Sequence, residues 1–565
     1  MGWSLGNQVQ LQPDVCYNNL KPAACAATRI SCADAPSRMG LRTLNHAKFQ
    51  RLCHCNFVVA ASRRPVIITS NPPLARLRAF HAPMRGISPP AYKIFRKQVS
   101  ETAAGIKQQS DFSKGSVSAN ILSLALPLTV AQLINVLYNV VDRIYIGHIP
   151  GASSAALTGV GVTFPILSIV IAFANLFGTG GAPLFSIARG RGDDAHAADI
   201  MGNTFTMLLG TGLVLTALVL AFKKPLLYLF GASDATFPYA DGYLTIYLCG
   251  TVFVMLGLGM NNFINAQGFG SMGMITVLLG AVVNIILDPV FIFALGMGVQ
   301  GAALATVISQ FLSALWAVAF LCGKKALLRL RPSSMRVRWK LVGEICALGL
   351  SGFIMSTTNS AVQVVCNATL QRWGGDVYVG VMTVLNSVRE ITTTPVMGIT
   401  NAAQPVIGFN FGAGEYKRVR SGIQFMSAVC VGYTAAVWLC LFLFPQAFIR
   451  LFTSDPALLA AGVPSMHVYF FGFFMMALQF AGQSTNTALG RARQAVFFSL
   501  LRKAVIVIPL TLWLPGRFGL GVNGVFLAEP ISNFLGGGAC FVTMLLTVWP
   551  DLKRRERLHA SGARG

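Results

Sequence analysis

The sequence has 565 residues, of which 54% are hydrophobic and only 11% are charged, and its mean hydropathy is +0.61. A soluble globular protein has about 25% charged residues, so this composition excludes a soluble fold and predicts a membrane protein with several spans. The net charge of +25 would suggest a nucleic-acid partner in a soluble chain. Here the Lys and Arg residues cluster in short loops and tails, where positive charge sets membrane topology. We therefore expect no nucleic-acid partner.

Residues 1–110 form a basic leader that contains no run of about 20 apolar residues, the length that a transmembrane helix needs. Residues 1–100 hold 14 Lys or Arg and only two acids, Asp14 and Asp34. An organellar transit peptide and translation from a misplaced start codon both fit such a leader, whereas the apolar segment of a secretory signal is missing. We expect the leader to be disordered or to come from a misplaced start. Cys53 and Cys55 flank His54 without a second pair at zinc spacing, so we expect no metal site there.

Twelve apolar segments of helix length follow the leader and are joined by short loops. We expect helices at 118–146, 154–182, 201–222, 240–266, 272–295 and 299–322, and then at 341–372, 377–404, 421–444, 464–488, 493–515 and 520–548. The pattern predicts an all-α membrane protein with twelve transmembrane helices. The first six form an N-lobe at 111–323 and the last six a C-lobe at 341–550, with a basic linker at 324–340 and a basic tail at 551–565.

The distribution of positive charge between the loops predicts the topology of the chain. The linker holds seven Lys or Arg residues and the segment 553–557 holds four, while the alternate loops carry few. Because Lys and Arg accumulate in cytoplasmic loops, we expect the linker and both termini to be cytoplasmic.

The first helix carries a row of polar residues in an otherwise apolar segment. The members are spaced by 3, 4 and 3 residues, which places them on one face of a helix, and they are Gln132, Asn135, Asn139 and Asp142. A carboxylate in hydrocarbon costs about 2.5–3.5 kcal/mol on insertion scales, so we expect Asp142 to face the bundle interior or a water-filled cavity. The other three would line the approach to it. Alternatively, Asp142 marks the end of the helix beside Arg143 at the membrane surface.

The two lobes repeat each other in sequence. Three blocks of the N-lobe, IARGRGDDAHAADIMGNTF, KPLLYLFGASD and GVQGAALATVISQ, align with IGFNFGAGEYKRVRSGIQF, FPQAFIRLFTSD and GVNGVFLAEPISN in the C-lobe, at an offset of 220 to 223 residues. A repeat of six helices keeps both copies in the same orientation. We therefore expect two six-helix bundles related by a pseudo-two-fold axis along the membrane normal, with a cleft between them, an arrangement typical of alternating access.

Four motifs stand out along the membrane part of the chain: LALPLTVAQLINVLYNVVDRIYIGHIPG, NIILDP, GVQGAALATVISQ and TTTPVMGITNAAQPVIGFNFGAGEY. Together they resemble the multidrug and toxic compound extrusion family, and within it the bacterial branch that includes the MepA-type pumps. The resemblance covers about residues 111–550. It implies a multi-pass exporter of the bacterial inner membrane that exchanges Na⁺ or H⁺ for amphiphilic, often cationic compounds. We expect a monomer among membrane lipids, with no cofactor beyond the coupling ion. The leader has no counterpart in the family, which favours a misplaced start.

In related members the first lobe holds a cation site, and the resemblance places its counterpart at Asp142, Asn284, Asp288 and Thr306. The residues agree with this expectation, because Asn284 and Asp288 are spaced i, i+4 on one helical face. Counting along the helices also puts all four at one depth. Two carboxylates with amide and hydroxyl oxygens suit either Na⁺ or H⁺ as the coupling ion.

An Asn of the fourth helix usually completes the family site. Asn261, Asn262 and Asn265 are available, and we carry Asn262 and Asn265 forward as candidates. A structural alternative for the whole group is that Asn284 and Asp288 only connect the first and fifth helices by hydrogen bonds.

The C-lobe does not duplicate the cation site. The repeat places Cys366 or Asn367 opposite Asp142, Pro509 opposite Asp288, and Glu529 opposite Thr306.

Two acids of the C-lobe are candidates for the substrate cleft. Glu529 and Glu390 could be buried acids that attract a cationic substrate, and Glu390 could instead be neutralised by its neighbour Arg389. With Asp142 and Asp288, these acids lead us to expect a neutral or negative interior that favours cationic amphiphiles.

Two other functional classes fit the sequence less well than an exporter. No nucleophile with a base, no metal cluster and no phosphate-binding loop is evident in the sequence, so we do not expect an enzyme. A flippase of lipid-linked saccharides shares the two-bundle architecture and is the alternative function. Such a flippase would be expected to line its cleft with several Arg residues. Only Arg389 is clearly in the middle of a helix, whereas Arg502 and Lys503 are expected near the inner end of the eleventh helix.

Overall fold

A computed structural model of the chain describes residues 57–59, 66–68, 110–147, 149, 153–452, 455–517 and 519–562. The chain divides into two compact units, Met1–Thr102 and Ala103–Gly565. In the first unit, the described residues form one antiparallel pair of strands, β1 (Phe57–Val59) and β2 (Val66–Ile68). The expectations for the rest of the leader, including Cys53 and Cys55, lie outside the described residues.

The second unit begins with the helices of the N-lobe. They are α4 (Val117–Gly147), α5 (Ser153–Gly190), α6 (Asp194–Leu229), α7 (Phe237–Cys249), α8 (Thr251–Ala266), α9 (Gly270–Pro289), the π-helical turn η3 (Val290–Ala294) and α10 (Gly298–Cys322). The helices α7 and α8 meet at a bend of 54° and together form the fourth predicted span. Each of the six helices predicted for this lobe therefore has a counterpart in the structure.

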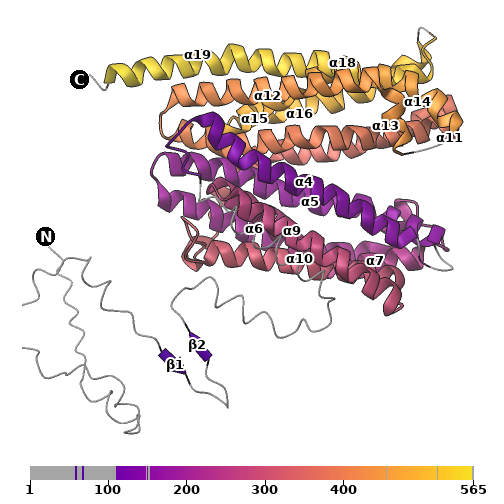
Figure 1. The fold of residues 1–565 in the computed structure, drawn as a ribbon, viewed down its shortest axis with the longest axis horizontal. Helices are drawn as coiled ribbons and strands as arrows, with labels where there is room; N and C mark the ends of the chain where they lie inside the picture. Colours follow the sequence, from indigo (N-terminus) through magenta and orange to yellow (C-terminus); the bar gives the residue numbers. More distant parts are fainter. Residues whose placement is uncertain are drawn as a thin grey trace, which may run out of the picture. The chain divides into compact units, whose positions relative to one another are not determined.

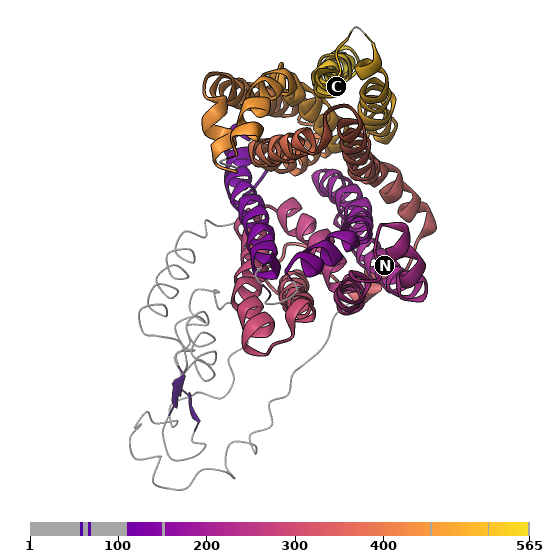
Figure 2. The same ribbon diagram turned by 90° about the vertical axis from the view of Figure 1, so that its right-hand side faces the viewer.

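The C-lobe follows a 3-10 turn in the linker, η4 (Pro332–Met335). Its elements are α11 (Trp339–Gly412), α12 (Tyr416–Leu443), α13 (Pro445–Arg450), α14 (Pro456–Tyr469), α15 (Phe473–Ala488), α16 (Ala492–Leu500), η5 (Leu501–Val507), α17 (Ile508–Trp513), η6 (Leu514–Gly516), α18 (Val522–Ser532), η7 (Asn533–Gly537) and α19 (Gly538–Gly562). The helices of the two lobes are coloured indigo to magenta and orange to yellow in Figure 1, and Figure 2 shows them end-on.

The number of spans agrees with the twelve predicted. Among the described residues, nine helices are long and apolar enough to cross a membrane, and counting each bent pair as one span gives eleven. The twelfth comes from α11, a run of 74 residues that is broken at Gly375, where φ is 68° and ψ is −166°. A left-handed φ is accessible to glycine at little cost, so Gly375 separates the seventh and eighth helices.

Several helices extend beyond the apolar segments from which they were predicted. The third helix, α6, begins at Asp194 instead of residue 201, because the Asp193 side chain caps it by accepting a hydrogen bond from the backbone N–H of His196 at 2.9 Å. Hydropathy locates the part of a helix that lies in the membrane, whereas capping determines where the helix ends.

The lobes meet where α5 packs along both halves of α11. Glycines allow the two backbones to approach closely at this contact. A Cβ on Gly349 would collide with the backbone of Leu176, and a Cβ on Gly412 would collide with the backbone of Ile187. Small residues have this role in many membrane helix pairs, because lipid-embedded helices associate through close packing.

The first helix, α4, belongs to the cores of both lobes. Its first turns, including Val117, Ile121 and Leu124, pack in a buried cluster with residues of α11, α12 and α15. Its last turn contributes Ile146 to the core of the N-lobe. The helix therefore connects the C-lobe to the region that carries Asp142.

The basic linker lies against the N-lobe. Arg338 forms an ion pair with Asp199 of α6 at 2.6 Å, and its backbone N–H donates to Asn203 Oδ1 at 2.7 Å. The Thr206 hydroxyl donates to the carbonyl of Met335 at 2.9 Å. These contacts fix one end of the predicted linker to the third helix.

Candidate functional site

The structure brings together the four N-lobe residues expected to bind the coupling ion. Asn284 and Asp288 lie one turn apart on α9, and Asn284 Nδ2 donates to Asp288 Oδ1 at 3.2 Å. The same nitrogen lies 3.4 Å from Thr306 Oγ1 on α10. Asp142 reaches the group from α4, within hydrogen-bonding distance of the Asp288 side chain. Asn284, Asp288 and Thr306 are all buried.

We call Asp142, Asn284, Asp288 and Thr306 the acid site. Two of its oxygens, Asn284 Oδ1 and Asp288 Oδ2, are buried and lack a hydrogen-bond partner among the described residues. Buried polar atoms are almost always hydrogen-bonded in native proteins, so these oxygens require a partner. Two adjacent carboxyl groups also resist simultaneous ionisation unless a positive charge lies between them. A bound Na⁺ or a proton would meet both requirements, and the donor set of carboxylate, amide and hydroxyl oxygens suits a hard cation.

Tyrosines that the sequence analysis did not single out surround the acid site. Tyr138 and Tyr243 lie close enough to Asp142 and Asp288 to interact with their charges. Tyr247 stacks on Tyr243 with ring centroids 6.1 Å apart. The sequence does contain a signal for Tyr138, which precedes Asp142 by four residues and therefore shares its helical face. These rings therefore form part of the wall of the site.

The asparagines of the fourth span lie apart from the acid site. The side-chain oxygens of Asn261 and Asn265 point at Gly273, near the beginning of α9. Asn262 Nδ2 donates to a carbonyl of its own helix at 3.2 Å. Gly273 precedes Asn284 by eleven residues, about 16 Å along a helix, so Asn262 and Asn265 do not join the group. The physical reason is that α8 and α9 are consecutive and antiparallel, which places the end of one beside the start of the other.

The remaining polar residues of the first helix are partly described. Gln132 and Asn135 are half-buried on α4, and the side chain of Asn139 lies outside the described residues.

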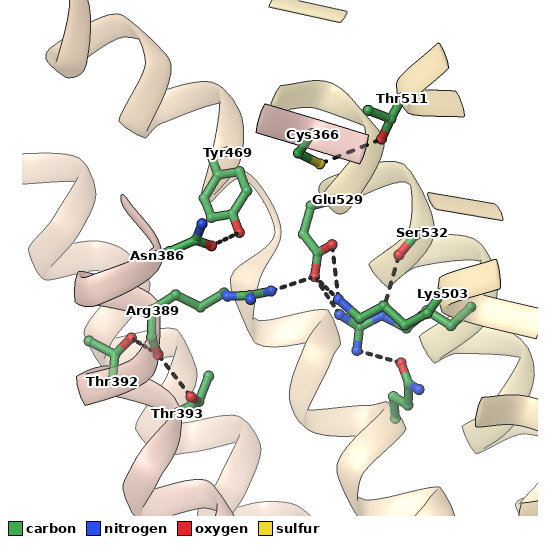
Figure 3. Close-up of polar contacts among 12 residues, drawn as sticks. Cys366, Asn386, Arg389, Thr392, Thr393, Tyr469, Lys503, Thr511, Glu529 and Ser532 are labelled. Carbon is green, nitrogen blue, oxygen red and sulfur yellow. Dashed lines mark hydrogen bonds and ion pairs between the residues drawn. The ribbon is translucent and has the colours of Figure 1, made fainter. Parts of the chain in front are cut away.

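Glu529 of the C-lobe is buried and contacts three positively charged side chains (Figure 3). Arg389 Nη1 lies 3.3 Å, Arg502 Nη2 2.5 Å and Lys503 Nζ 3.0 Å from Glu529 Oε1. We call these four residues the basic cluster. The expectation that Glu529 adds negative charge to the interior does not agree with this arrangement, because three cations surround one carboxylate.

Arg502 and Lys503 lie on the π-helical turn η5 and are buried, in contrast to the expected position near the inner end of the helix. Arg502 is held on all sides, since Nη1 donates to Gln479 Oε1 at 2.7 Å and Nε donates to Ser532 Oγ at 3.3 Å. The sequence contained a signal for this, because Arg502 is ten residues inside a span that begins at Ala492, about 15 Å and half the thickness of the hydrocarbon.

Glu390 does not take part in the basic cluster. Its side chain is exposed, and among the described ion pairs Arg389 contacts Glu529 and not Glu390. Neither of the two roles considered for Glu390, a buried acid or the ionic partner of Arg389, corresponds to this position.

A pocket adjoins the basic cluster between α11, α14, η5 and α18. It contains about 370 Å³ of space between atoms, including the part open to solvent. The polar residues of its wall include Asn359, Gln363, Asn386, Arg389, Tyr469, Lys503 and Glu529. The charge of the wall is therefore positive.

Comparison with known proteins agrees with this architecture. The family model described as MatE matches residues 127–290 and 353–513, one block in each lobe and more than half of the chain. The multidrug export protein MepA of Staphylococcus haemolyticus is 26% identical over 428 residues, which cover 75% of this chain and 93% of that protein. The MepA protein of Staphylococcus aureus is 25% identical over 443 residues, covering 78% of this chain and 95% of that protein.

Solved structures show the same fold. A crystal structure of MATE in the bent conformation superimposes with a TM-score of 0.75 at 21% sequence identity, covering 80% of this chain and 100% of that chain. An outward-facing conformation of a MATE family multidrug resistance transporter gives a TM-score of 0.74 at 21% identity, with coverages of 79% and 100%. The chain has multiple candidate membrane spans, is similar to the MepA multidrug export proteins and belongs to the MatE family.

Proposed function

We propose that this transporter is a secondary antiporter that exports amphiphilic cations in exchange for Na⁺ or H⁺ bound at Asp142 and Asp288. The observation that supports the proposal most directly is the environment of Asp288, which is buried beside a second carboxyl group. Its Oδ2 atom has no hydrogen-bond partner among the described residues. A cation at this position would neutralise the pair and satisfy the unpaired oxygen.

The residues present define how either ion would be held. Na⁺ would take oxygen ligands from Asp142, Asp288 and Asn284, with Thr306 beside them, whereas a proton would be shared between the two carboxyl groups. Either ion would remove the repulsion between the two carboxylates and so allow Asp142 and Asp288 to stay close together. Loss of the ion would favour a larger separation of Asp142, on α4, from Asp288.

The first helix supplies a physical route from ion binding to the lobes. Its beginning packs in the core of the C-lobe and its end carries Asp142 to the N-lobe site. A change in the distance between Asp142 and Asp288 would therefore move α4, which packs in the cores of both lobes. An ion that favours one arrangement of the lobes and a substrate that favours the other are coupled by the difference in their affinities for the two states.

We infer the orientation from the positive charge of the linker and tail, which places both on the cytoplasmic side of a bacterial inner membrane. In this orientation the ion gradient drives export. Amphiphilic compounds reach the protein from the membrane lipids, and a monomer contains both lobes and hence a complete site.

The flippase of lipid-linked saccharides is the second candidate, and one observation favours it. The basic cluster brings Arg389, Arg502 and Lys503 together in the C-lobe, whereas only Arg389 was expected in the middle of a helix. Two buried carboxyl groups in the N-lobe would not help to bind an anionic lipid. We therefore prefer ion-coupled export.

The experiment uses everted membrane vesicles that contain the full chain, with ethidium as the fluorescent cation. Uptake is followed under an imposed Na⁺ gradient and, separately, under an imposed pH gradient. Uphill transport under one gradient alone identifies the coupling ion. Transport under neither gradient, combined with movement of a lipid-linked saccharide, would instead establish the flippase.

A further inference from the structure

The basic cluster carries more positive charge than its single acid can neutralise. Arg side chains do not lose their charge in proteins, so Arg389 and Arg502 alone outnumber Glu529, and a charged Lys503 raises the excess to two. All three cations contact the same oxygen, Glu529 Oε1, and Lys503 Nζ also donates to Oε2 at 3.2 Å. A buried charge without its own counter-charge is costly, so the cluster is suited to a further anion.

Arg502 and Arg389 differ in how many of their N–H groups form hydrogen bonds. Arg502 has a side chain that is only 2% exposed and donates to Glu529, Gln479 and Ser532. Arg389 has five N–H donors, of which one takes part in a side-chain hydrogen bond to the described residues, through Nη1 to Glu529. Its side chain is 28% exposed. Arg502 therefore serves as the fixed counter-charge of Glu529, whereas Arg389 has N–H groups that are available to bind a further acceptor.

Arg389, which has these unused donors, lines the pocket of the C-lobe. Arg389 and Lys503 both line it, and Figure 3 shows them reaching Glu529 from opposite sides. Asn386 and Tyr469 lie next to Arg389, with the tyrosine hydroxyl donating to Asn386 Oδ1 at 3.3 Å. An anionic group in this pocket would meet a guanidinium, an ammonium and neutral polar groups together.

We propose that this pocket binds a carboxylate group of the transported compound, with Arg389 as its main donor and Lys503 as the second. The inference extends the proposed function, on which it rests, by naming the substrate class as amphiphiles that carry a carboxylate in addition to any positive charge. A guanidinium presents parallel N–H groups that match the two oxygens of a carboxylate, which favours this group over a single-point acceptor. The coupling cation and the carboxylate then bind in different lobes and do not compete for one charge.

The test is a binding measurement on the purified full chain in detergent. The probes are a rhodamine dye with a free carboxylate and the methyl ester of the same dye, which differ only in the anionic group. We expect the free acid to bind more tightly than the ester by about tenfold or more, as a charge-assisted hydrogen bond implies. Arg389→Gln should remove this preference while leaving the affinity for the ester within about twofold, and Arg389→Lys should restore part of it.

Arg372→Gln is the matched control, because Arg372 belongs to the other half of α11, before the break at Gly375, and is exposed and outside the pocket. Equal affinity of the wild-type chain for acid and ester would overturn the proposal, as would an equal loss for both dyes in Arg389→Gln. Binding is repeated in bilayer discs with and without anionic phospholipid. Displacement of the acid dye by that lipid, lost in Arg389→Gln, would assign the pocket to a lipid headgroup and also overturn it. Gradient-driven export of the ester without a preference for the acid would leave the proposed antiport intact.

Discussion

Arg389 Nη1 lies 3.3 Å from Oε1 of Glu529, the oxygen that Arg502 and Lys503 also contact. Glu529 is the residue that the internal repeat places opposite Thr306 of the acid site. The groups around these two positions therefore differ in net charge: the N-lobe groups two acids with neutral polar residues, and the C-lobe groups three cations around one acid. This asymmetry supports our proposal that the coupling cation binds in the N-lobe.

Removing the acid of the basic cluster should destabilise the protein. In Glu529→Gln the buried cations lose their only described counter-charge, and breaking a buried ion pair in this way costs about 3–5 kcal/mol. The apparent unfolding temperature of the purified protein in detergent should fall accordingly. Glu390→Gln is the control, because Glu390 is exposed and an exposed substitution costs less than about 0.5 kcal/mol. Equal losses in the two variants would contradict the assignment of Glu529.

The acid site could be derived from sequence because its members obey regular rules. Asn284 and Asp288 follow the i, i+4 spacing of a regular helix, and the family resemblance pointed to Asp142 and Thr306. The structure shows that these four side chains meet. The asparagines of the fourth span could not be placed in the same way, because their depth depends on the turn between α8 and α9.

The basic cluster was harder to derive. Arg389, Arg502 and Glu529 come from distant parts of the chain, and no motif joins them. The turn that carries Arg502 and Lys503, η5, is π-helical, so a count of 3.6 residues per turn gives the wrong direction for its side chains. The repeat did align Glu529 with Thr306, but it could not reveal that Glu529 is outnumbered by cations.

The close contact between the lobes should depend on Gly349. A Cβ at this position collides with the backbone of Leu176 on α5, and backbone cannot move aside as a side chain can. Overpacking of this kind costs about 1–3 kcal/mol, so Gly349→Ala should shift the balance between closed and open lobe contacts by about 5- to 150-fold. Distances between spin labels on α5 and α11 measure the shift. Gly343→Ala on the same helix meets nothing within 4 Å, and an equal effect there would refute the argument.

The leader should be dispensable, whereas the segment that follows it should not. Arg418 of α12 donates to the carbonyls of Phe112 at 3.0 Å and Gly115 at 2.8 Å. Removal of residues 1–109 keeps both acceptors, so insertion and efflux should be unchanged. Removal of 1–116 loses both, at about 1.5–3 kcal/mol for each hydrogen bond to a charged group. Thermal unfolding and dye efflux of the two truncations test the difference. Loss of membrane insertion in the shorter truncation would show that the leader is a sorting signal.

The measurement that tests the central claim most directly compares uphill and downhill transport by Asp288→Asn in proteoliposomes. Asparagine keeps the size of the side chain but removes the carboxylate beside Asp142. We expect uphill export of ethidium under the effective ion gradient to fall to the level of protein-free liposomes, while binding of the dye and the unfolding temperature remain close to wild type. Asp376→Asn, at an exposed position of α11, should transport normally. Full ion-driven uphill export by Asp288→Asn would contradict the assignment of the coupling ion to this site.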